Sequence, residues 1–229
     1  MHLQKLLGIL LKLISLIVKL LEKYAEFVKD EVLPSLNLSK DELELQALRS
    51  VERDLEQVLH SWQCRAKLLD GKALDYTDEQ IDFIKKQLVE VQKDIEKLVF
   101  TNQDLQKRQN ILTSYKGVGK KIANSLIAEM PELGTLSNKE AASLAGVAPK
   151  TIESGKKVGK GHITGGRFFI RKALYMAALV AAYSNDKMKK KYQELLAKGK
   201  AKKVALTVIM RKIIVCLNAM LKNNKMYEI

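Results

Sequence analysis

The 229-residue sequence is short of the residues that interrupt helices and of those that bind metals. It contains three prolines and twelve glycines. So few of both argue against long disordered segments and against an all-β fold. The two cysteines, Cys64 and Cys216, fit no ligand or disulfide spacing, so we expect buried thiols in a reducing, cytoplasmic compartment. The three scattered histidines form no cluster with them, and we expect no metal site in this chain.

Acidic residues are scarce in the second half of the chain. Residues 1–110 carry 17 Lys and Arg against 19 Asp and Glu, a net charge of −2. Residues 111–229 carry 23 against 7, a net charge of +16. A basic half beside a neutral half is typical of a nucleic-acid-binding surface. The plainer alternative is a solvated or membrane-facing basic surface.

The first thirty residues lack a long uncharged run. Lys5, Lys12 and Lys19 interrupt every apolar stretch, whereas a membrane-spanning helix needs about 20 largely uncharged residues. No small-residue cleavage site follows. The pattern predicts an amphipathic helix that packs on a partner helix or another subunit, with a membrane-surface helix as the alternative. Its polar positions share an arc of about 100°: Gln4, Lys5, Gly8, Lys12, Ser15, Lys19, Glu22, Lys23 and Glu26.

Two long helices are expected next. Pro34 ends the first helix, because proline disfavours helical geometry in the residue before it. Ser39 and Glu42 form a capping box for a helix that Gly71 closes. Another helix is expected to start near Thr77. Regular spacing of apolar residues predicts an antiparallel coiled-coil hairpin within residues 1–110, a dimerisation or spacer arm rather than an ordinary bundle core. Those positions are Leu48, Val51, Leu55, Val58 and Trp62, then Ile81, Ile84, Leu88, Val91, Ile95 and Leu98.

Residues 111–229 are predicted to form a second, basic domain, and the fold class is all-α. No strand-like alternation is present. A helix ends near Tyr115, and the next covers residues 121–130. A capping box at Ser137 and Glu140 opens a short helix that stops at Gly146. After a basic loop, three further helices are expected over residues 168–182, 187–197 and 202–221, with Gly199 between the last two.

The turn Lys116-Gly-Val-Gly-Lys-Lys121 resembles a helix-hairpin-helix. Glycines at 117 and 119 let the backbone approach a phosphate, and the free amides at the start of the next helix donate to it. Lys116, Lys120 and Lys121 add positive charge there. The alternative is a glycine C-cap between two core helices.

The basic loop over residues 150–162 contains a candidate nucleophile, Ser154. A serine beside glycine is ordinarily a turn residue, and a hydroxyl needs a base or a metal to become a nucleophile. Lys156, Lys157 and Lys160 make the loop a candidate nucleic-acid contact. Arg167, Arg171 and Lys172 lie near one face of the following helix, where they form either a phosphate clamp or a solvated basic face.

An ordered series of motifs over about residues 100–225 closely resembles the C-terminal domain of the bridge-RNA-guided insertion-sequence transposases, insertion-sequence family one-hundred-ten. The hairpin resembles that family's linker more loosely. The matching segments are Gly117-Val-Gly119, Leu144-Ala-Gly-Val-Ala-Pro149, Ser154-Gly-Lys, Ala173-Leu-Tyr-Met-Ala-Ala178, Gly199-Lys-Ala-Lys-Lys-Val-Ala205, and Arg211-Lys with Leu217-Asn-Ala219.

The resemblance implies the division of labour found in that family. Its N-terminal resolvase-like domain holds Mg²⁺ with four carboxylates, and its C-terminal domain supplies a serine that forms a phosphoserine link to DNA. Ser154 is thereby implied as the nucleophile. The last metal-binding aspartates are expected near Ile14 to Val18, yet residues 1–21 contain no Asp or Glu. We therefore expect a truncated member with no cofactor of its own, Mg²⁺ being expected only with the missing acidic domain.

The implied function is that of a DNA-binding transposase fragment acting in DNA recombination. Its expected partners are DNA, a structured guide RNA, and either further copies of itself or a full-length transposase. The alternative function is a catalytically inactive regulator that binds nucleic acid and titrates the full-length enzyme. A membrane partner is the least favoured.

Overall fold

The computed structural model describes residues 14–23, 37–150, 153–154, 157–158 and 161–227. The chain divides into two compact units, Met1–Asn37 and Leu38–Ile229. In the first unit, residues 14–23 form a helix whose side chains are all exposed. The polar positions predicted over residues 4–12 and at Glu26, and the predicted helix end at Pro34, lie outside the described residues.

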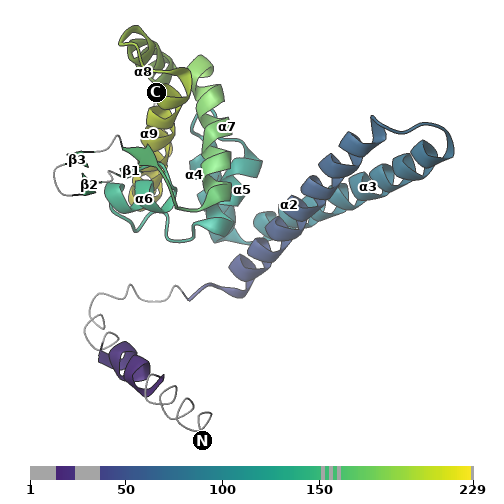
Figure 1. Ribbon diagram of the computed structural model, residues 1–229, viewed down its shortest axis with the longest axis horizontal. Coiled ribbons are helices and arrows are strands. Elements are labelled where there is room, and N and C mark those ends of the chain that lie inside the picture. The colour runs from purple at the N-terminus through teal and green to yellow at the C-terminus, as the bar shows by residue number, and fades with distance from the viewer. Residues whose placement is uncertain (1–13, 24–36, 151–152, 155–156, 159–160, 228–229) are drawn as a thin grey trace, which may run out of the picture. The chain divides into compact units, whose positions relative to one another are not determined.

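Two long helices open the second unit. Helix α2 (Lys40–Ala66) and helix α3 (Gly71–Thr101) lie side by side along their length and are joined by a short turn, forming an arm (Figure 1). The capping box is confirmed: the Ser39 hydroxyl accepts from the Glu42 amide, and the Glu42 carboxylate accepts from the Ser39 amide. The predicted end at Gly71 and start near Thr77 are wrong. Gly71 opens α3, and the Thr77 hydroxyl donates to the Ala73 carbonyl one turn earlier, as a residue inside a helix does.

The apolar stripe predicted for α3 is confirmed, whereas that for α2 is only partly buried. Ile81, Ile84, Leu88 and Ile95 are buried. On α2, Val51 and Val58 are 47% and 44% exposed, and the buried positions are Leu45, Arg49 and Glu52. The reason is that the base of α2 also packs on helix α5 (Lys120–Glu129), which selects a different face from the one that meets α3. The prediction of two buried thiols fails for Cys64, which is exposed on the arm, while Cys216 is half-buried.

The described part of the second unit contains six further helices, and the fold is all-α (Figure 1). They are α4 (Gln103–Thr113), α5 (Lys120–Glu129), α6 (Asn138–Leu144), α7 (Phe168–Ser184), α8 (Asp186–Ala197) and α9 (Lys202–Asn223). The predicted domain boundary after residue 110 falls inside α4, whose Asn102 cap accepts from the amides of Asp104 and Leu105. Because Leu45, Ile95 and Val99 share one hydrophobic cluster with α4 to α9, the base of the arm and the helices after it are packed as one unit.

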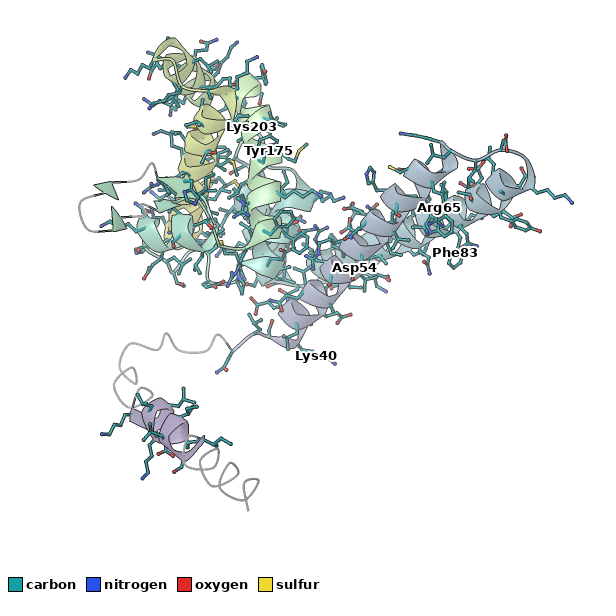
Figure 2. All side chains as sticks on the ribbon, in the orientation of Figure 1. Lys40, Asp54, Arg65, Phe83, Tyr175 and Lys203 are labelled. Carbon is teal, nitrogen blue, oxygen red and sulfur yellow. The ribbon has the colours of Figure 1, made fainter. Side chains whose placement is uncertain are left out.

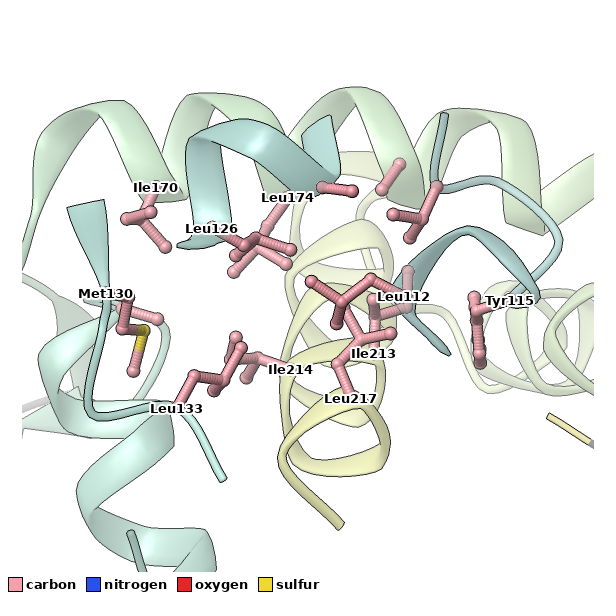
Figure 3. Close-up of a cluster of buried hydrophobic side chains, with 14 of the residues drawn as sticks. Leu112, Tyr115, Leu126, Met130, Leu133, Ile170, Leu174, Ile213, Ile214 and Leu217 are labelled. Carbon is pink, nitrogen blue, oxygen red and sulfur yellow. The ribbon is translucent and has the colours of Figure 1, made fainter. Parts of the chain in front are cut away.

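Helix α9 lies at the centre of that cluster. Its Ile213, Ile214 and Leu217 pack against Leu112, Leu126 and Leu174 from α4, α5 and α7 (Figure 3). Asn218 ties α9 to the connection before α6: its amide nitrogen donates to the Leu136 carbonyl at 2.7 Å, and its oxygen accepts from the Gly134 amide at 2.8 Å. Within the described residues, α9 is the one helix long and apolar enough to cross a membrane, and half of its apolar window is buried in this core.

The basic loop is closed at its base by two glycines. Gly146 and Gly166 have φ values of +68° and +69°, and a Cβ built on Gly166 would lie 2.3 Å from the Gly146 Cα. The strands β1 (Pro149–Lys150) and β4 (His162–Ile163) pair antiparallel just beyond, followed by β2 (Glu153–Ser154) with β3 (Lys157–Val158). Two-residue strands are too short for an alternating pattern, so the sequence predicted only a loop here.

Candidate nucleic-acid interface

The glycine turn between α4 and α5 is built for close packing on one side and is open on the other. Gly117 has a φ of +109°, and a Cβ there would lie 2.9 Å from the Ala177 carbonyl oxygen and 3.2 Å from the Ala181 Cβ. Gly117 therefore allows the turn to approach α7, rather than a phosphate. Gly119 has an ordinary φ of −86°, and its Cβ position is free of neighbours within 4 Å.

Helix α5 begins at that open glycine without a side-chain cap. Gly119 is the N-cap and makes no side-chain hydrogen bond to the first turn. The amides of a first helical turn have no partner within the helix, and they attract anions. Lys116, Lys120 and Lys121 around them are exposed. This end of α5 is a candidate anion-binding position.

The start of α5 opens onto a groove of about 520 Å³ between α2, α5 and α7, the α2–α5–α7 groove. Helix α2 contributes Arg49, Arg53 and Glu56 to its lining. The lining from α5 includes Lys121, Ser125 and Glu129, with Gly119 at the helix start. Helix α7 adds Phe169, Lys172 and Met176. Three residues predicted from the sequence to bind nucleic acid, Gly119, Lys121 and Lys172, thus share one groove.

The cations of the groove are held in place to different degrees. Arg53 pairs with Glu129 at 2.6 Å, and its guanidinium carbon lies 3.9 Å from the Phe169 ring centroid. Lys121 forms ion pairs with Glu56 and with Glu52, the latter at 3.6 Å, and so anchors α5 to α2. Lys172 is exposed and forms no ion pair within the described residues. Lys172 is therefore the cation most available to an incoming anion.

A buried arginine lies behind this surface. Arg49 is 7% exposed; it pairs with Glu52, and its Nη2 donates to the Ser125 hydroxyl at 2.6 Å. Its Nε is buried and has no hydrogen-bond partner within the described residues. Burial raises the pKa of the nearby Glu129 carboxyl, against the opposite influence of Arg53 and Arg49. Both arginines lie in the half of the sequence without net positive charge, so the charge count did not identify them. The signal that could have identified them is their i, i+4 spacing, which places both on one face of the helix.

The predicted arginine clamp on α7 is not assembled. Arg167 donates from both terminal nitrogens to the Glu132 carboxylate and from Nη1 to the Glu129 carbonyl at 2.8 Å. Arg171 donates to the Gly165 carbonyl and lies near the Phe168 ring. Arg167 thus holds the loop to α5's end, and Arg171 secures the Gly165 backbone. Local sequence placed the three cations on one helix, but tertiary carboxylates and carbonyls occupy two of them.

The candidate nucleophile lies on the basic loop. The Ser154 backbone stands opposite Lys157 in the β2–β3 pair. The side chains of Ser154 and Lys157, and all of Lys156 and Lys160, lie outside what the structure describes. The described part of the chain contains no group of three or more His, Cys, Asp or Glu side chains arranged to hold a metal ion, so no step through Mg²⁺ is assigned to these residues.

The segment that matches known proteins includes much of the region that forms this site. Residues 109–193 match the family model described as the transposase IS116/IS110/IS902 family. The chain is 27% identical over 194 residues to the pilin gene-inverting proteins of Moraxella bovis and Moraxella lacunata, covering 83% of this chain and 60% of each relative. It therefore spans less than two thirds of their length.

A third relative is an insertion-element protein. The chain is 32% identical over 121 residues to the insertion element IS110 uncharacterized 43.6 kDa protein of Streptomyces coelicolor, covering 52% of this chain and 30% of that protein. The matched segment, residues 109–193, contains α5, α7 and the basic loop. The groove's α2 wall lies outside it.

Proposed function

We propose that this chain binds duplex DNA along the α2–α5–α7 groove and acts in transposase-type DNA recombination. The observation that carries the proposal is the convergence of the open α5 start at Gly119 with Lys172, more than fifty residues later, in one groove that Arg49 and Arg53 complete. Free amides and exposed ammonium groups are the donors that proteins use for DNA phosphates. The family match over residues 109–193 and the relatives' names support the reaction class.

Ser154 is the proposed nucleophile of that reaction. Its hydroxyl oxygen would give up its proton and attack a backbone phosphorus, forming a phosphoserine ester. The bond from phosphorus to a deoxyribose oxygen would break, and that oxygen would take up a proton and leave as a hydroxyl group. The basic loop, with Lys156, Lys157 and Lys160, would hold the strand being cut. A structured guide RNA and an oligomer built through the arm and the first helix are further parts of the proposal. Any Mg²⁺ used in the reaction would be held by carboxylates outside the described residues.

The DNA-binding half is tested with one exposed lysine. Lys172→Gln removes a charge that no described carboxylate pairs with, so the fold is expected to be unchanged. We expect duplex affinity to fall for every sequence tested, and the slope of log affinity against log salt to decrease in magnitude by about 1. The matched control is Lys72→Gln, which is also exposed and lies at the start of α3, where the two helices of the arm are joined and outside the lining of the groove. Equal duplex binding by both variants would contradict the groove assignment.

The chemical half is tested by trapping. The chain is mixed with duplex DNA, Mg²⁺ and a longer family member, and covalent protein–DNA adducts are resolved on a denaturing gel. An adduct of this chain that disappears in Ser154→Ala supports the nucleophile. Retained DNA binding with no adduct at all would refute it, and would favour the regulator that binds without cutting.

A further inference from the structure

A second cleft lies across α5 from the groove, and its lining differs in kind. The α3–α4–α5 cleft has a volume of about 500 Å³. Lys93, Lys97 and Phe100 line it from α3, Gln106 and Asn110 line it from α4, and Lys120 lines it from α5. This volume falls in the range of about 300–1,000 Å³ that small organic ligands occupy. None of these residues except Lys120 was predicted to bind nucleic acid.

The break between α3 and α4 creates the cleft. Helix α3 ends at Thr101, and Asn102 caps α4 while its amide nitrogen donates to Asp41 at 2.6 Å. This fixes the point where the two helices diverge. Val99 below the cleft is 2% exposed and belongs to the core. The floor of the cleft is therefore part of the hydrophobic core.

Phe100 stands exposed at the rim. Its side chain is 74% exposed, immediately after the buried Val99. Lys97 and Lys93 lie about one and two helical turns before it along the same helix, and the cleft also includes Glu96. Lys93 forms an exposed ion pair with Glu90 at 2.9 Å, whereas Lys97 and Lys120 form none within the described residues. Three ammonium groups against the carboxylates of Glu90 and Glu96 leave an excess of one positive charge beside an exposed aromatic face. This combination binds a phosphate and a planar base together.

A smaller pocket of about 250 Å³ lies between the two sites, beside the start of α5. It shares Glu96 and Lys120 with the cleft, and Arg49 and Lys121 with the groove. The adjacent residues Lys120 and Lys121 project to different sides of α5, because successive residues of a helix are about 100° apart. The groove, this smaller pocket and the cleft are therefore neighbours that share lining residues.

We propose that the α3–α4–α5 cleft binds an unpaired nucleotide of a nucleic-acid strand, its base stacked on Phe100 and its phosphates held by Lys93, Lys97 and Lys120. The amides of Gln106 and Asn110 supply donors and acceptors for the edge of the base. Bases in a duplex are paired and stacked on one another, so this site selects single-stranded DNA or RNA. The site goes beyond the duplex groove and requires nothing of Ser154.

The test compares two phenylalanines on the same helix. Phe100→Leu removes the stacking face at the cleft, and Phe83→Leu makes the same change at an exposed residue on the arm, away from α4 to α9 (Figure 2). Binding of the full chain to fluorescein-labelled oligothymidylate and oligouridylate of about 20 nucleotides, and to a duplex of the same length, is measured by anisotropy. We expect Phe100→Leu to weaken single-strand binding by about 5-fold or more. Phe83→Leu and all duplex affinities should stay unchanged.

Paired lysine variants test the phosphate contacts. Lys93→Gln with Lys97→Gln should reduce the magnitude of the single-strand salt slope by about 1.4, whereas Lys72→Gln with Lys86→Gln removes equal charge from the arm and should leave it unchanged. If these variants weaken binding of both oligothymidylate and oligouridylate, the site recognises only the phosphates and bases that DNA and RNA share. If they weaken binding of one polymer only, the site prefers that type of strand.

Three results would overturn the cleft proposal: equal single-strand binding by the two phenylalanine variants, an equal loss of duplex binding in Phe100→Leu, or no single-strand binding by the wild-type chain. Each leaves the Lys172 duplex result intact as a separate test of the groove.

Discussion

Gly117→Ala is the substitution that best separates packing from phosphate binding in the glycine turn. Gly117 has a φ of +109°, a region that residues with a Cβ rarely adopt. Its new methyl group would lie 2.9 Å from the Ala177 carbonyl oxygen and 3.2 Å from the Ala181 Cβ and amide nitrogen. Both neighbours belong to the buried face of α7. The turn and α7 must therefore separate, or the turn must change conformation.

The two costs add to a large fraction of the stability of a domain. A left-handed conformation costs an L-residue about 1–2 kcal/mol, and overpacking a close contact costs about 1–3 kcal/mol. We therefore expect Gly117→Ala to lower the free energy of unfolding by about 2–5 kcal/mol. For a domain of this size, that corresponds to a fall in Tm of at least about 4 °C.

Thermal unfolding followed by circular dichroism measures the effect, and Gly119→Ser is the matched control. Gly119 has a φ of −86° and no neighbour at its Cβ position, and serine is a favourable N-cap. Gly119→Ser should leave stability within about 0.5 kcal/mol of the wild type. A Tm for Gly117→Ala within about 1 °C of the wild-type value would refute the packing argument.

Two further predictions concern the start of α5 at Gly119 and the ion pair of Arg167. Gly119→Ser should weaken duplex DNA binding by about 3-fold or more without unfolding the chain, because its hydroxyl competes for the α5 amides; unchanged affinity by anisotropy would remove those amides from the interface. Arg167→Met should lower the free energy of unfolding by about 1–3 kcal/mol near pH 7 in urea titrations. Burial raises the pKa of Glu132, but its hydrogen bonds and ion pair with Arg167 outweigh this and hold that pKa below the ordinary glutamate value. A lowered carboxyl pKa stabilises the fold above the unfolded pKa, and this contribution is lost as pH falls through the folded pKa. The deficit of Arg167→Met should therefore shrink on acidification, and a deficit that grows at low pH would contradict the ion-pair explanation.

Much of the helical framework was predictable because its signals are local. The capping boxes at Ser39 and Ser137 satisfy amides within the same turn, so their sequence spacing is sufficient to place the helix starts. The apolar repeat from Ile81 to Ile95 identified the buried face of α3 for the same reason. Gly71 misled because a glycine can open a helix as well as close one, and only contacts beyond the turn decide between the two.

The sequence by itself determined that this protein is helical, that its second half is basic, and that its ordered motifs resemble those of the transposase family whose model matches residues 109–193. Tertiary structure decided which of the candidate cations remain available. Arg167 and Lys121 are paired with Glu132 and Glu56, residues distant in the sequence, while Lys172 is not paired within the described residues. It also brought Arg49 and Arg53 of the arm against Ser125 and Glu129 of α5, and opened the cleft beside Phe100. Periodicity and capping depend on neighbours within one or two turns, whereas a groove depends on which helix faces meet, and that is fixed only when the whole core packs.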